Sequence, residues 1–340
     1  MNEAIKNLIQ EAEAAHKPED SLPWEADKPF TQALYTYNAS TTKWEPTPSS
    51  TPTPNTIKNL ALFSWNIDFM LPHANSRMIS ALSELETQLS KLPPTTAAVI
   101  FLQECTPSDL DIIGETSWVR SAFARTDVSP ENWASGMYGT TTLVDRRLKG
   151  EVFRVHFSLT RMERDALFVD VLFPSSSPEG EKEGEKRIIR FCNTHLESLA
   201  REPAYRPPQV ALAAKFMHDE GVHGALLAGD LNAIQPFDRT LHSENNLHDA
   251  YLSLGGVEDS EEGYTWGQQA TPELRQMYGC SRMDKVWYCG GVTVSKFGRF
   301  GADVEVRDET EKEMIKRWGG FEKAWVTDHL GVWAIVDVVD

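Results

Sequence analysis

Cysteine is scarce in this chain, with four among 340 residues: Cys105, Cys192, Cys280 and Cys289. No two of them have the CxxC spacing of zinc or redox motifs, and four in a chain of this length do not make a disulfide scaffold. We interpret them as reduced thiols of an intracellular protein. The sequence does not choose between nucleus and cytoplasm.

Long apolar runs are also missing. No uninterrupted apolar segment approaches the ~20 residues of a membrane helix, so we expect no membrane span. Residues 1–17 mix charges with short apolar patches and lack the apolar region of a secretory signal.

Positive charge is in deficit. Lys and Arg total 33 against 50 Asp and Glu, a net charge of −17. This excludes a protein that grips nucleic acid over its whole surface, because neutralising phosphates requires clustered Lys and Arg. A local anion site remains open, above all one whose positive charge is a bound metal ion.

The remaining composition is that of a globular protein: 41% of the residues are hydrophobic and 10% aromatic, enough for a sizeable core. We expect a helix and an aromatic extended arm over 1–45, which packs on the main body. We predict that the Pro/Ser/Thr-rich residues 46–56 form a linker and that residues 57–340 form the main domain. Residues 174–187 read as a solvated insert. We expect a monomer, with 29–45 available to a protein partner.

From residue 57 onward, strand and helix patterns alternate, which indicates an α/β fold. Apolar runs predict strands and helical spacing predicts helices. The strands are expected at 60–65, 97–102, 140–145, 152–159, 166–173, 187–195, 225–229, 284–289, 292–298 and 331–338, and the helices at 76–92 and 207–220.

Polar clusters follow four of these strands, and a fifth precedes the last one. They are Asn66 with Asp68, Gln103-Glu104, Thr194-His195 with Glu197, Gly229-Asp230-Leu231-Asn232 and Thr327-Asp328-His329. Strand ends of layered α/β folds converge at one rim, where ligand sites form. Carboxylates and amides gathered there suit a hard cation such as Mg²⁺ beside a phosphate.

Six motifs together resemble the endonuclease/exonuclease/phosphatase superfamily. They are Ser64-Trp65-Asn66-Ile67-Asp68, Leu102-Gln103-Glu104, Asn193-Thr194-His195-Leu196-Glu197-Ser198, Gly229-Asp230-Leu231-Asn232, Arg282-Met283-Asp284-Lys285-Val286-Trp287-Tyr288 and Thr327-Asp328-His329. The resemblance implies a four-layer α/β sandwich, with two mixed sheets face to face and helices outside. Trp-Asn-Ile-Asp, Thr-His-Leu-Glu-Ser and Tyr264-Thr265-Trp266 look most like the type-2 tyrosyl-DNA phosphodiesterases, with abasic-site endonucleases as the next neighbour. Thr327 stands where that branch usually has Ser.

The resemblance also implies roles for the motif residues. Glu104 would be the main ligand of Mg²⁺, for which Mn²⁺ can substitute, with Asn66, Asp68 and Asp328 around the ion. Asp230 would activate water and Asn232 would hold that water or a phosphate oxygen. His195 and His329 would donate hydrogen bonds to phosphoryl oxygens, with Asp284 behind His329.

Substrate contacts are less constrained by the motifs. Trp266 either stacks on a base or packs at a turn. The candidate phosphate contacts are Arg206, Arg239, Lys285, Lys296 and Arg299, with solvated surface as the default interpretation of each. The negative net charge favours a narrow groove for a few nucleotides of one strand or a DNA end.

We therefore hypothesise a Mg²⁺-dependent phosphodiesterase acting on 5′-phosphotyrosyl-DNA or a related DNA end. The alternatives are an abasic-site endonuclease or exonuclease, a phosphodiesterase acting on RNA, phospholipid or inositol phosphate, and a pseudoenzyme that serves as a binding module.

Overall fold

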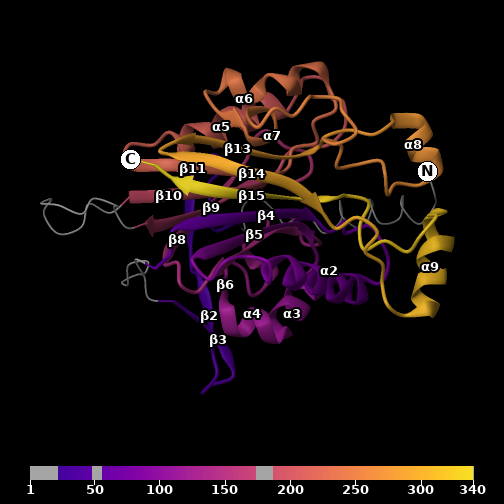
Figure 1. Ribbon diagram of the computed structural model, residues 1–340, viewed down its shortest axis with the longest axis horizontal. Helices are drawn as coiled ribbons and strands as arrows, with labels where there is room; N and C mark the ends of the chain where they lie inside the picture. Colours follow the sequence, from indigo (N-terminus) through magenta and orange to yellow (C-terminus); the bar gives the residue numbers. More distant parts are fainter. Residues whose placement is uncertain (1–21, 48–55, 174–186, 340) are drawn as a thin grey trace, which may run out of the picture.

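Two mixed sheets lie face to face, with helices on the outer side of each (Figure 1). The computed structural model describes residues 22–47, 56–173 and 187–339. The first sheet runs, in spatial order, β1 (Pro29–Gln32), β8 (Gly150–His156), β9 (Asp165–Phe173), β10 (Arg187–His195), β11 (Val222–Asp230), β13 (Asp284–Gly290) and β12 (His248–Asp249). The second runs β14 (Val292–Phe300), β15 (Gly331–Val338), β4 (Asn59–Asn66), β5 (Thr96–Cys105), β7 (Gly139–Asp145), β6 (Phe123–Arg125), β2 (Tyr35–Asn38) and β3 (Lys43–Pro46).

The helices fall into three groups in Figure 1. Beside the second sheet are α2 (Ala74–Leu89), α3 (Pro107–Glu115) and α4 (Ser117–Ala122); beside the first are α5 (Arg206–Met217), α6 (Leu241–Glu244) and α7 (Ala250–Ser253); at one end are α8 (Pro272–Tyr278) and α9 (Glu309–Gly319). Two 3₁₀ turns span Pro130–Asn132 and Pro236–Arg239. The predicted four-layer α/β sandwich is confirmed. Of the described residues, no helix is both long and apolar enough to cross a membrane.

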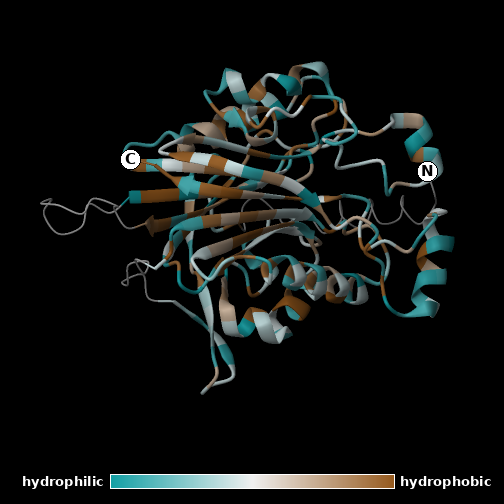
Figure 2. Cartoon of the chain, in the orientation of Figure 1, coloured by the Kyte–Doolittle hydropathy of each residue, from teal (hydrophilic) through white to brown (hydrophobic). Residues whose placement is uncertain are grey.

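Three apolar layers hold the sandwich together (Figure 2). The central layer joins inward-facing side chains of the two sheets, such as Leu62 and Phe101 from one and Phe191 and Leu226 from the other. A second layer seals the second sheet against α2 and α3, and a third seals the first sheet against α5. A strand that is buried on both faces has a nearly continuous apolar sequence. The central strands could be predicted from the sequence for that reason.

The arm that precedes residue 48 contributes strands to both sheets. β1 pairs with β8 of the first sheet and β2 with β6 of the second. Arg125 lies over the ring of Trp44 at 4.3 Å, and Leu34 is 4% exposed within the central layer. The helix expected at 3–15, residues 48–55 of the expected linker and residues 174–186 of the expected insert lie outside the described residues.

If the arm belongs to the folded body, truncating its core residue will destabilise the whole domain. We expect Leu34→Ala to lower the free energy of unfolding by about 2–5 kcal/mol, as for other buried leucines. Leu159→Ala is the matched control, because Leu159 is 53% exposed; its cost should stay within about 0.5 kcal/mol. Urea denaturation measures both. Equal midpoints for the two variants would show that the arm is only loosely docked.

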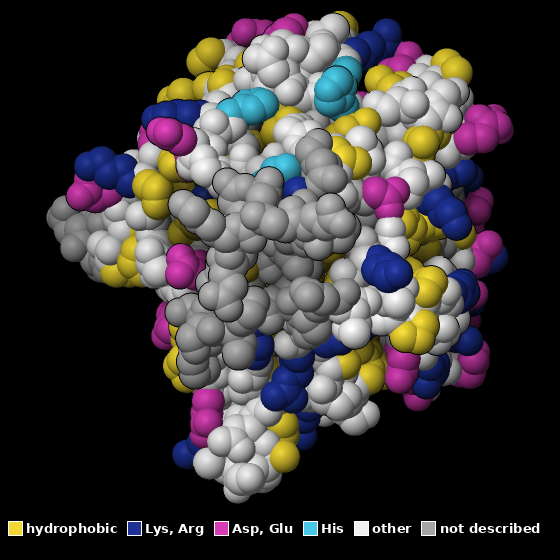
Figure 3. Space-filling model, turned by 60° about the vertical axis from the view of Figure 1, so that its left-hand side comes forward, with side chains coloured by type: hydrophobic (Ala, Val, Ile, Leu, Met, Phe, Trp, Pro, Cys, Tyr) yellow, Lys and Arg dark blue, Asp and Glu magenta, His cyan; other side chains and the backbone are white. Residues whose placement is uncertain are grey.

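Charges are mixed on the face opposite α8 and α9. Figure 3 shows Lys and Arg interspersed with Asp and Glu there, without a continuous basic patch on the side chains in view. The side chains in view thus carry both signs of charge.

The rim of the sandwich is fixed by a buried amide pair between the sheets. The Gln103 side chain donates to Asn193 Oδ1 at 2.8 Å, and the Asn193 amide donates to the Thr141 carbonyl at 2.9 Å. Buried amides cost free energy unless they are paired, so these partners set the register of one sheet over the other. The next residues along the two strands, Glu104 and Thr194-His195, are thereby held at one edge.

Candidate active site

Asp230 lies at the centre of the polar rim. It is the last residue of β11, opposite His195 on parallel β10 and opposite Asp284 on antiparallel β13. Asn66, at the end of β4 in the other sheet, donates from Nδ2 to Asp230 Oδ2 at 2.9 Å and to Glu104 Oε1 at 3.3 Å. Residues separated by more than 160 positions therefore converge where strand ends from both sheets meet.

Glu104 reaches this cluster through an irregularity in its strand. The pairing register of β5 with β7 shifts between Leu102 and Cys105, and Glu104 has φ = +56°. A bulge of this kind re-aims a side chain, and a left-handed conformation at a non-glycine residue carries strain that is typical of functional sites. The Glu104 carboxylate also accepts from the backbone N–H of Phe69 at 3.0 Å.

His329 carries a carboxylate partner. Its Nδ1 lies 2.8 Å from Asp284 Oδ2, and its Nε2 lies 3.6 Å from Asp230 Oδ2 and 3.8 Å from Asp328 Oδ1. Burial lowers the pKa of His329, but the charges of these three carboxylates outweigh it and hold the pKa well above its usual value. His329 is therefore a buried imidazolium at neutral pH.

His195 has the opposite surroundings. Its Nε2 lies 3.3 Å from Asp230 Oδ2 and 3.7 Å from Glu104 Oε1, while its Nδ1 lies 2.7 Å from Nη1 of Arg164. Burial and the charge of Arg164 lower the pKa of His195, although Asp230 and Glu104 pull it upward. The rim thus pairs one charged and one neutral imidazole around a single carboxylate.

Asp230 itself is held as an anion. Burial alone would raise its pKa, but His329, His195 and the backbone N–H of Asn232 outweigh burial and lower the pKa below its ordinary value. Burial raises the pKa of Asp284 to about 6 despite the lowering effect of His329. Asp230 and Asp284 are therefore both ionised at neutral pH.

Asp68, in the loop after β4, adds a further carboxylate close to Glu104 and Asp328. Burial, with the charges of Asp328 and Glu104, raises the pKa of Asp68 to about 8, against the lowering by Arg77. Asp68 and Glu104 both have φ = +56°, and Asp68 is 6% exposed. Crowded carboxylates of this kind repel one another unless a cation lies between them.

Asn232 and Trp266 are placed by contacts with this cluster. Asn232 has φ = +47°, and its side-chain amide donates to the Leu196 carbonyl at 3.0 Å. Trp266 is half-buried and donates from Nε1 to Asp328 Oδ2 at 2.6 Å, so its polar edge is fixed beside the site. Of the two interpretations of Trp266, packing is therefore supported by its hydrogen bond to Asp328. The centroid of the Trp266 ring lies 6.4 Å from that of Tyr278.

Three of the basic residues named from sequence form ion pairs with carboxylates. Arg206 is 2% exposed and is held by Asp238, with Nη2 to Oδ2 at 2.7 Å, so it is a structural ion pair. Arg239 is exposed and pairs with Asp259. Lys285 is 1% exposed and pairs with Glu258. Arg206 and Lys285 are therefore buried in ion pairs, whereas the ion pair of Arg239 lies at the surface.

The structural role of Arg206 can be tested. Removing one partner of a buried ion pair typically costs about 3–5 kcal/mol, so we expect Arg206→Met to lower the free energy of unfolding by about that amount. Below its melting temperature the variant should keep the wild-type KM for a phosphodiester substrate. A raised KM with unchanged stability would instead restore Arg206 as a substrate contact.

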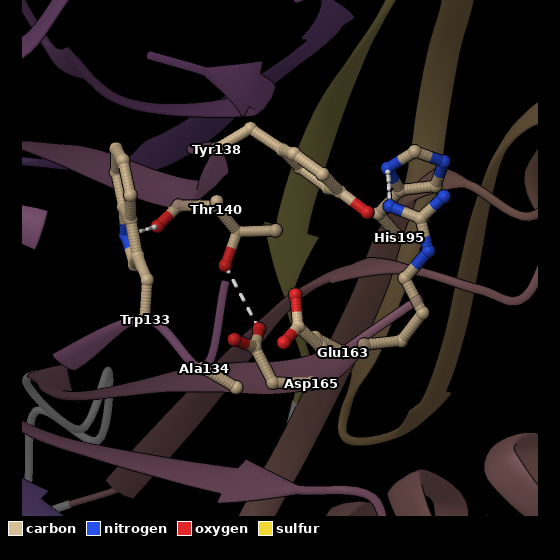
Figure 4. Close-up of a pocket in the computed structure, with 9 residues that line it drawn as sticks. Trp133, Ala134, Tyr138, Thr140, Glu163, Asp165 and His195 are labelled. Atoms are coloured by element: carbon tan, nitrogen blue, oxygen red, sulfur yellow. Dashed lines mark hydrogen bonds between the residues drawn. The ribbon is translucent and has the colours of Figure 1, made fainter. Parts of the chain in front are cut away.

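Sequence reasoning missed three side chains that line the site. Phe69 stacks on Tyr138 with ring centroids 4.1 Å apart, and the guanidinium of Arg164 lies 5.4 Å from the Tyr138 ring centroid. Figure 4 shows the Tyr138 side chain pointing toward His195. None of the three belongs to one of the six motifs, although Phe69 directly follows Asp68. Only that proximity offered a signal in the sequence.

The segment that contains the polar clusters matches a known protein family. A model of the Endonuclease/Exonuclease/phosphatase family matches residues 63–329, which run from β4 to His329 and enclose all five polar clusters. The chain belongs to this family. Its fold is accordingly that of phosphodiesterases and nucleases, and family members typically depend on a divalent metal.

Solved structures show the same fold at low sequence identity. TDP2 from D. rerio, complexed with a single-strand DNA product, is 19% identical with a TM-score of 0.58, covering 82% of this chain and 99% of that one. TDP2 from C. elegans is 20% identical with a TM-score of 0.57, covering 82% and 75%. The human Nocturnin catalytic domain with bound sulfate is 17% identical with a TM-score of 0.51, covering 83% and 95%. No curated protein sequence matches the chain.

The rim fits a hard divalent cation. One oxygen of Glu104, one of Asp230 and a nitrogen of His195 lie within 4.8 Å of one another, and Asp68 and Asp328 add carboxylates nearby. Burial raises the pKa of Asp68 most, and the charges of Asp328 and Glu104 raise it further, as expected where carboxylates crowd together. Asn66 turns its Nδ2 toward Glu104 and Asp230, so the candidate ligand atoms of the rim are mainly carboxylate oxygens, which Mg²⁺ prefers.

Proposed function

We propose that this protein is a Mg²⁺-dependent phosphodiesterase that hydrolyses a 5′-phosphotyrosyl bond of DNA or a related DNA end. The observation that carries the proposal is Asp230, an ionised and 2% exposed carboxylate within 3.6 Å of two imidazoles of opposite charge state. Burying such a network costs stability, and networks of this kind cluster at functional sites.

The metal would be held by Glu104, with Asp68, Asp328 and Asn66 directly or through water. When bound, Mg²⁺ polarises the phosphoryl group and offsets its developing negative charge. Without it, the carboxylates around the rim would repel a phosphodiester.

The chain's own residues account for the remaining steps. Asp230 accepts a proton from the attacking water, which Asn232 holds in place. The imidazolium of His329 donates from Nε2 to a non-bridging phosphoryl oxygen, and Asp284 accepts from Nδ1, which fixes the orientation of the ring and stabilises its charge. His195 donates to the same group from the other side. These donors are fixed before the reaction begins, which is the arrangement that lowers a barrier most effectively.

The substrate assignment draws on the motifs and on one structural relative. The six motifs resemble the type-2 tyrosyl-DNA phosphodiesterases, and the D. rerio TDP2 structure holds a single-strand DNA product. A tyrosine leaving group has a pKa near 10, so its phenolate departs with little help from an acid. We place no dedicated general acid at the rim, which suits a leaving group of this kind.

A substrate panel tests the assignment. Purified protein with Mg²⁺ is incubated with a 5′-phosphotyrosyl oligonucleotide, abasic duplex DNA, RNA, an inositol phosphate and phospholipid vesicles, with chelator as the control. We expect metal-dependent release of tyrosine at the highest kcat/KM. A preference for another substrate would overturn the DNA-end assignment and keep the phosphodiesterase. Inactivity on all five, with no Mg²⁺ binding by calorimetry, would favour a pseudoenzyme.

A further inference from the structure

Arg164 is a buried cation without a carboxylate partner in the described part of the chain. It is 6% exposed, and its contacts are His195, the sulfur of Met162 and the face of Tyr138. Its Nε is buried with no hydrogen-bond partner there. Arg154, by contrast, is fully buried between Asp127 and Asp165, at 3.0 and 2.7 Å. Burying a guanidinium without such compensation is expensive, which points to a role beyond stability.

The contact between Arg164 and His195 fixes where the histidine proton lies. A guanidinium has only N–H donors, so Nδ1 of His195, 2.7 Å from Nη1, must present its lone pair. The imidazole proton is then on Nε2. That nitrogen faces Asp230 Oδ2 at 3.3 Å and Glu104 Oε1 at 3.7 Å, and both carboxylates can accept from it.

The loop that carries Arg164 is anchored by a motif residue that the catalytic steps do not use. Glu197, 1% exposed, accepts from Thr160 Oγ1 at 2.8 Å and from the backbone N–H of Arg161 at 3.1 Å. Thr160 Oγ1 in turn accepts from the backbone N–H of Arg164 at 3.0 Å. Figure 4 shows the hydrogen bond between the guanidinium and the His195 ring.

The tautomer decides whether His195 can bind a metal. A histidine ligand must offer a lone pair, and Nε2 is the nitrogen that faces Glu104 and Asp230. With a lone pair on Nε2, these three residues would form a mixed nitrogen and oxygen site within 4.8 Å, which suits Zn²⁺ or Co²⁺. With a proton on Nε2, only the oxygen donors remain, and these suit Mg²⁺.

We propose that Arg164 is a positioning residue that locks His195 as the Nε2–H tautomer, making His195 a hydrogen-bond donor to substrate and excluding it from the metal's ligands. The metal-selecting half rests on the proposed function, because it assumes that a divalent ion is held at Glu104. The tautomer half rests on the Arg164 contact alone.

The tautomer is measurable without metal, substrate or turnover. Long-range ¹H–¹⁵N spectra of the full chain, labelled with ¹⁵N-histidine and freed of metal by chelation, distinguish a protonated ring nitrogen from a bare one. His195→Asn assigns the signals. We expect wild-type His195 to show a protonated Nε2 and a bare Nδ1. A proton on Nδ1, or on both nitrogens, would overturn the proposal even if every variant failed to fold.

Variants then test the consequence for metal choice. In Arg164→Met we expect loss of the fixed tautomer and binding of Co²⁺ at least about tenfold tighter than in wild type, seen in titrations of its visible absorption. The gain should vanish in the double variant that also carries His195→Asn. Arg164→Lys, which keeps an N–H donor, should retain the wild-type tautomer.

Three results would contradict the proposal. Arg164→Met with a wild-type tautomer would remove Arg164 as the cause. A Co²⁺ gain that survives His195→Asn would remove His195 as the new ligand. A shifted tautomer in Arg164→Lys equal to that in Arg164→Met would assign the effect to packing rather than to the donor. Failure of the substrate panel would touch none of these measurements, so the two proposals fail separately.

Discussion

Asp230→Asn is expected to lower kcat on a 5′-phosphotyrosyl oligonucleotide by about 10²–10⁴-fold, the range for losing a general base. The amide keeps the shape of the carboxylate and can still accept from Asn66, but it cannot take a proton from water. KM should change little, since the group acts mainly on the transition state. Steady-state kinetics at saturating Mg²⁺ measures both parameters.

The matched control makes the same chemical change away from the rim. Asp170 lies on β9 and pairs with Arg190, Oδ1 to Nε at 2.7 Å. Asp170→Asn should cost stability, about 1–3 kcal/mol, and leave kcat at the wild-type value. Activity of Asp230→Asn within tenfold of wild type would remove Asp230 from the mechanism.

Glu104→Gln is expected to separate metal binding from folding. The wild-type protein should gain about 2.7 kcal/mol of stability when Mg²⁺ reaches a hundred times its dissociation constant. The Gln variant should lose most of that gain, with Mg²⁺ affinity lower by at least about 100-fold, since even outer-shell partners of a metal site cost 10–100-fold. Thermal melts across a Mg²⁺ series measure the effect.

The same variant should be no less stable than wild type when metal is removed. One of the charges that raise the pKa of Asp68 is gone, so the crowding of carboxylates is relieved. Glu151→Gln, at an exposed position of β8, is the control, and it should respond to Mg²⁺ as wild type does. An unchanged Mg²⁺ response in Glu104→Gln would place the metal elsewhere.

Some helices that the sequence analysis did not predict, such as α3, are short and are marked only by their capping residues. α3 begins at a capping box, in which the Thr106 side chain accepts from the Asp109 N–H and Asp109 accepts from the Thr106 N–H, with Pro107 at its first position. That Thr-Pro-x-Asp pattern is readable from sequence. The predicted helix 76–92 ends at Leu89 instead, because the chain must turn into extended backbone before Pro93.

The sequence alone determined the ten longer strands of the main domain, the polar clusters at strand ends and the family, whereas the short β6 and β12 and the strands of the arm were not predicted. These depend on patterns within ten residues of each position: apolar runs for doubly covered strands, and motif residues immediately after them. The pairing of His329 with Asp284 was also implied, since both lie in motifs.

Only the tertiary structure decided which charges meet. Arg206 and Arg164 both precede apolar segments, and nothing local distinguishes them, yet one is paired with Asp238 and the other touches His195. The partner of a buried charge is set by how distant strands and loops pack, because the cost of burial depends on the whole environment of the charge. The division between structural and functional arginines in this protein is for that reason a property of its fold.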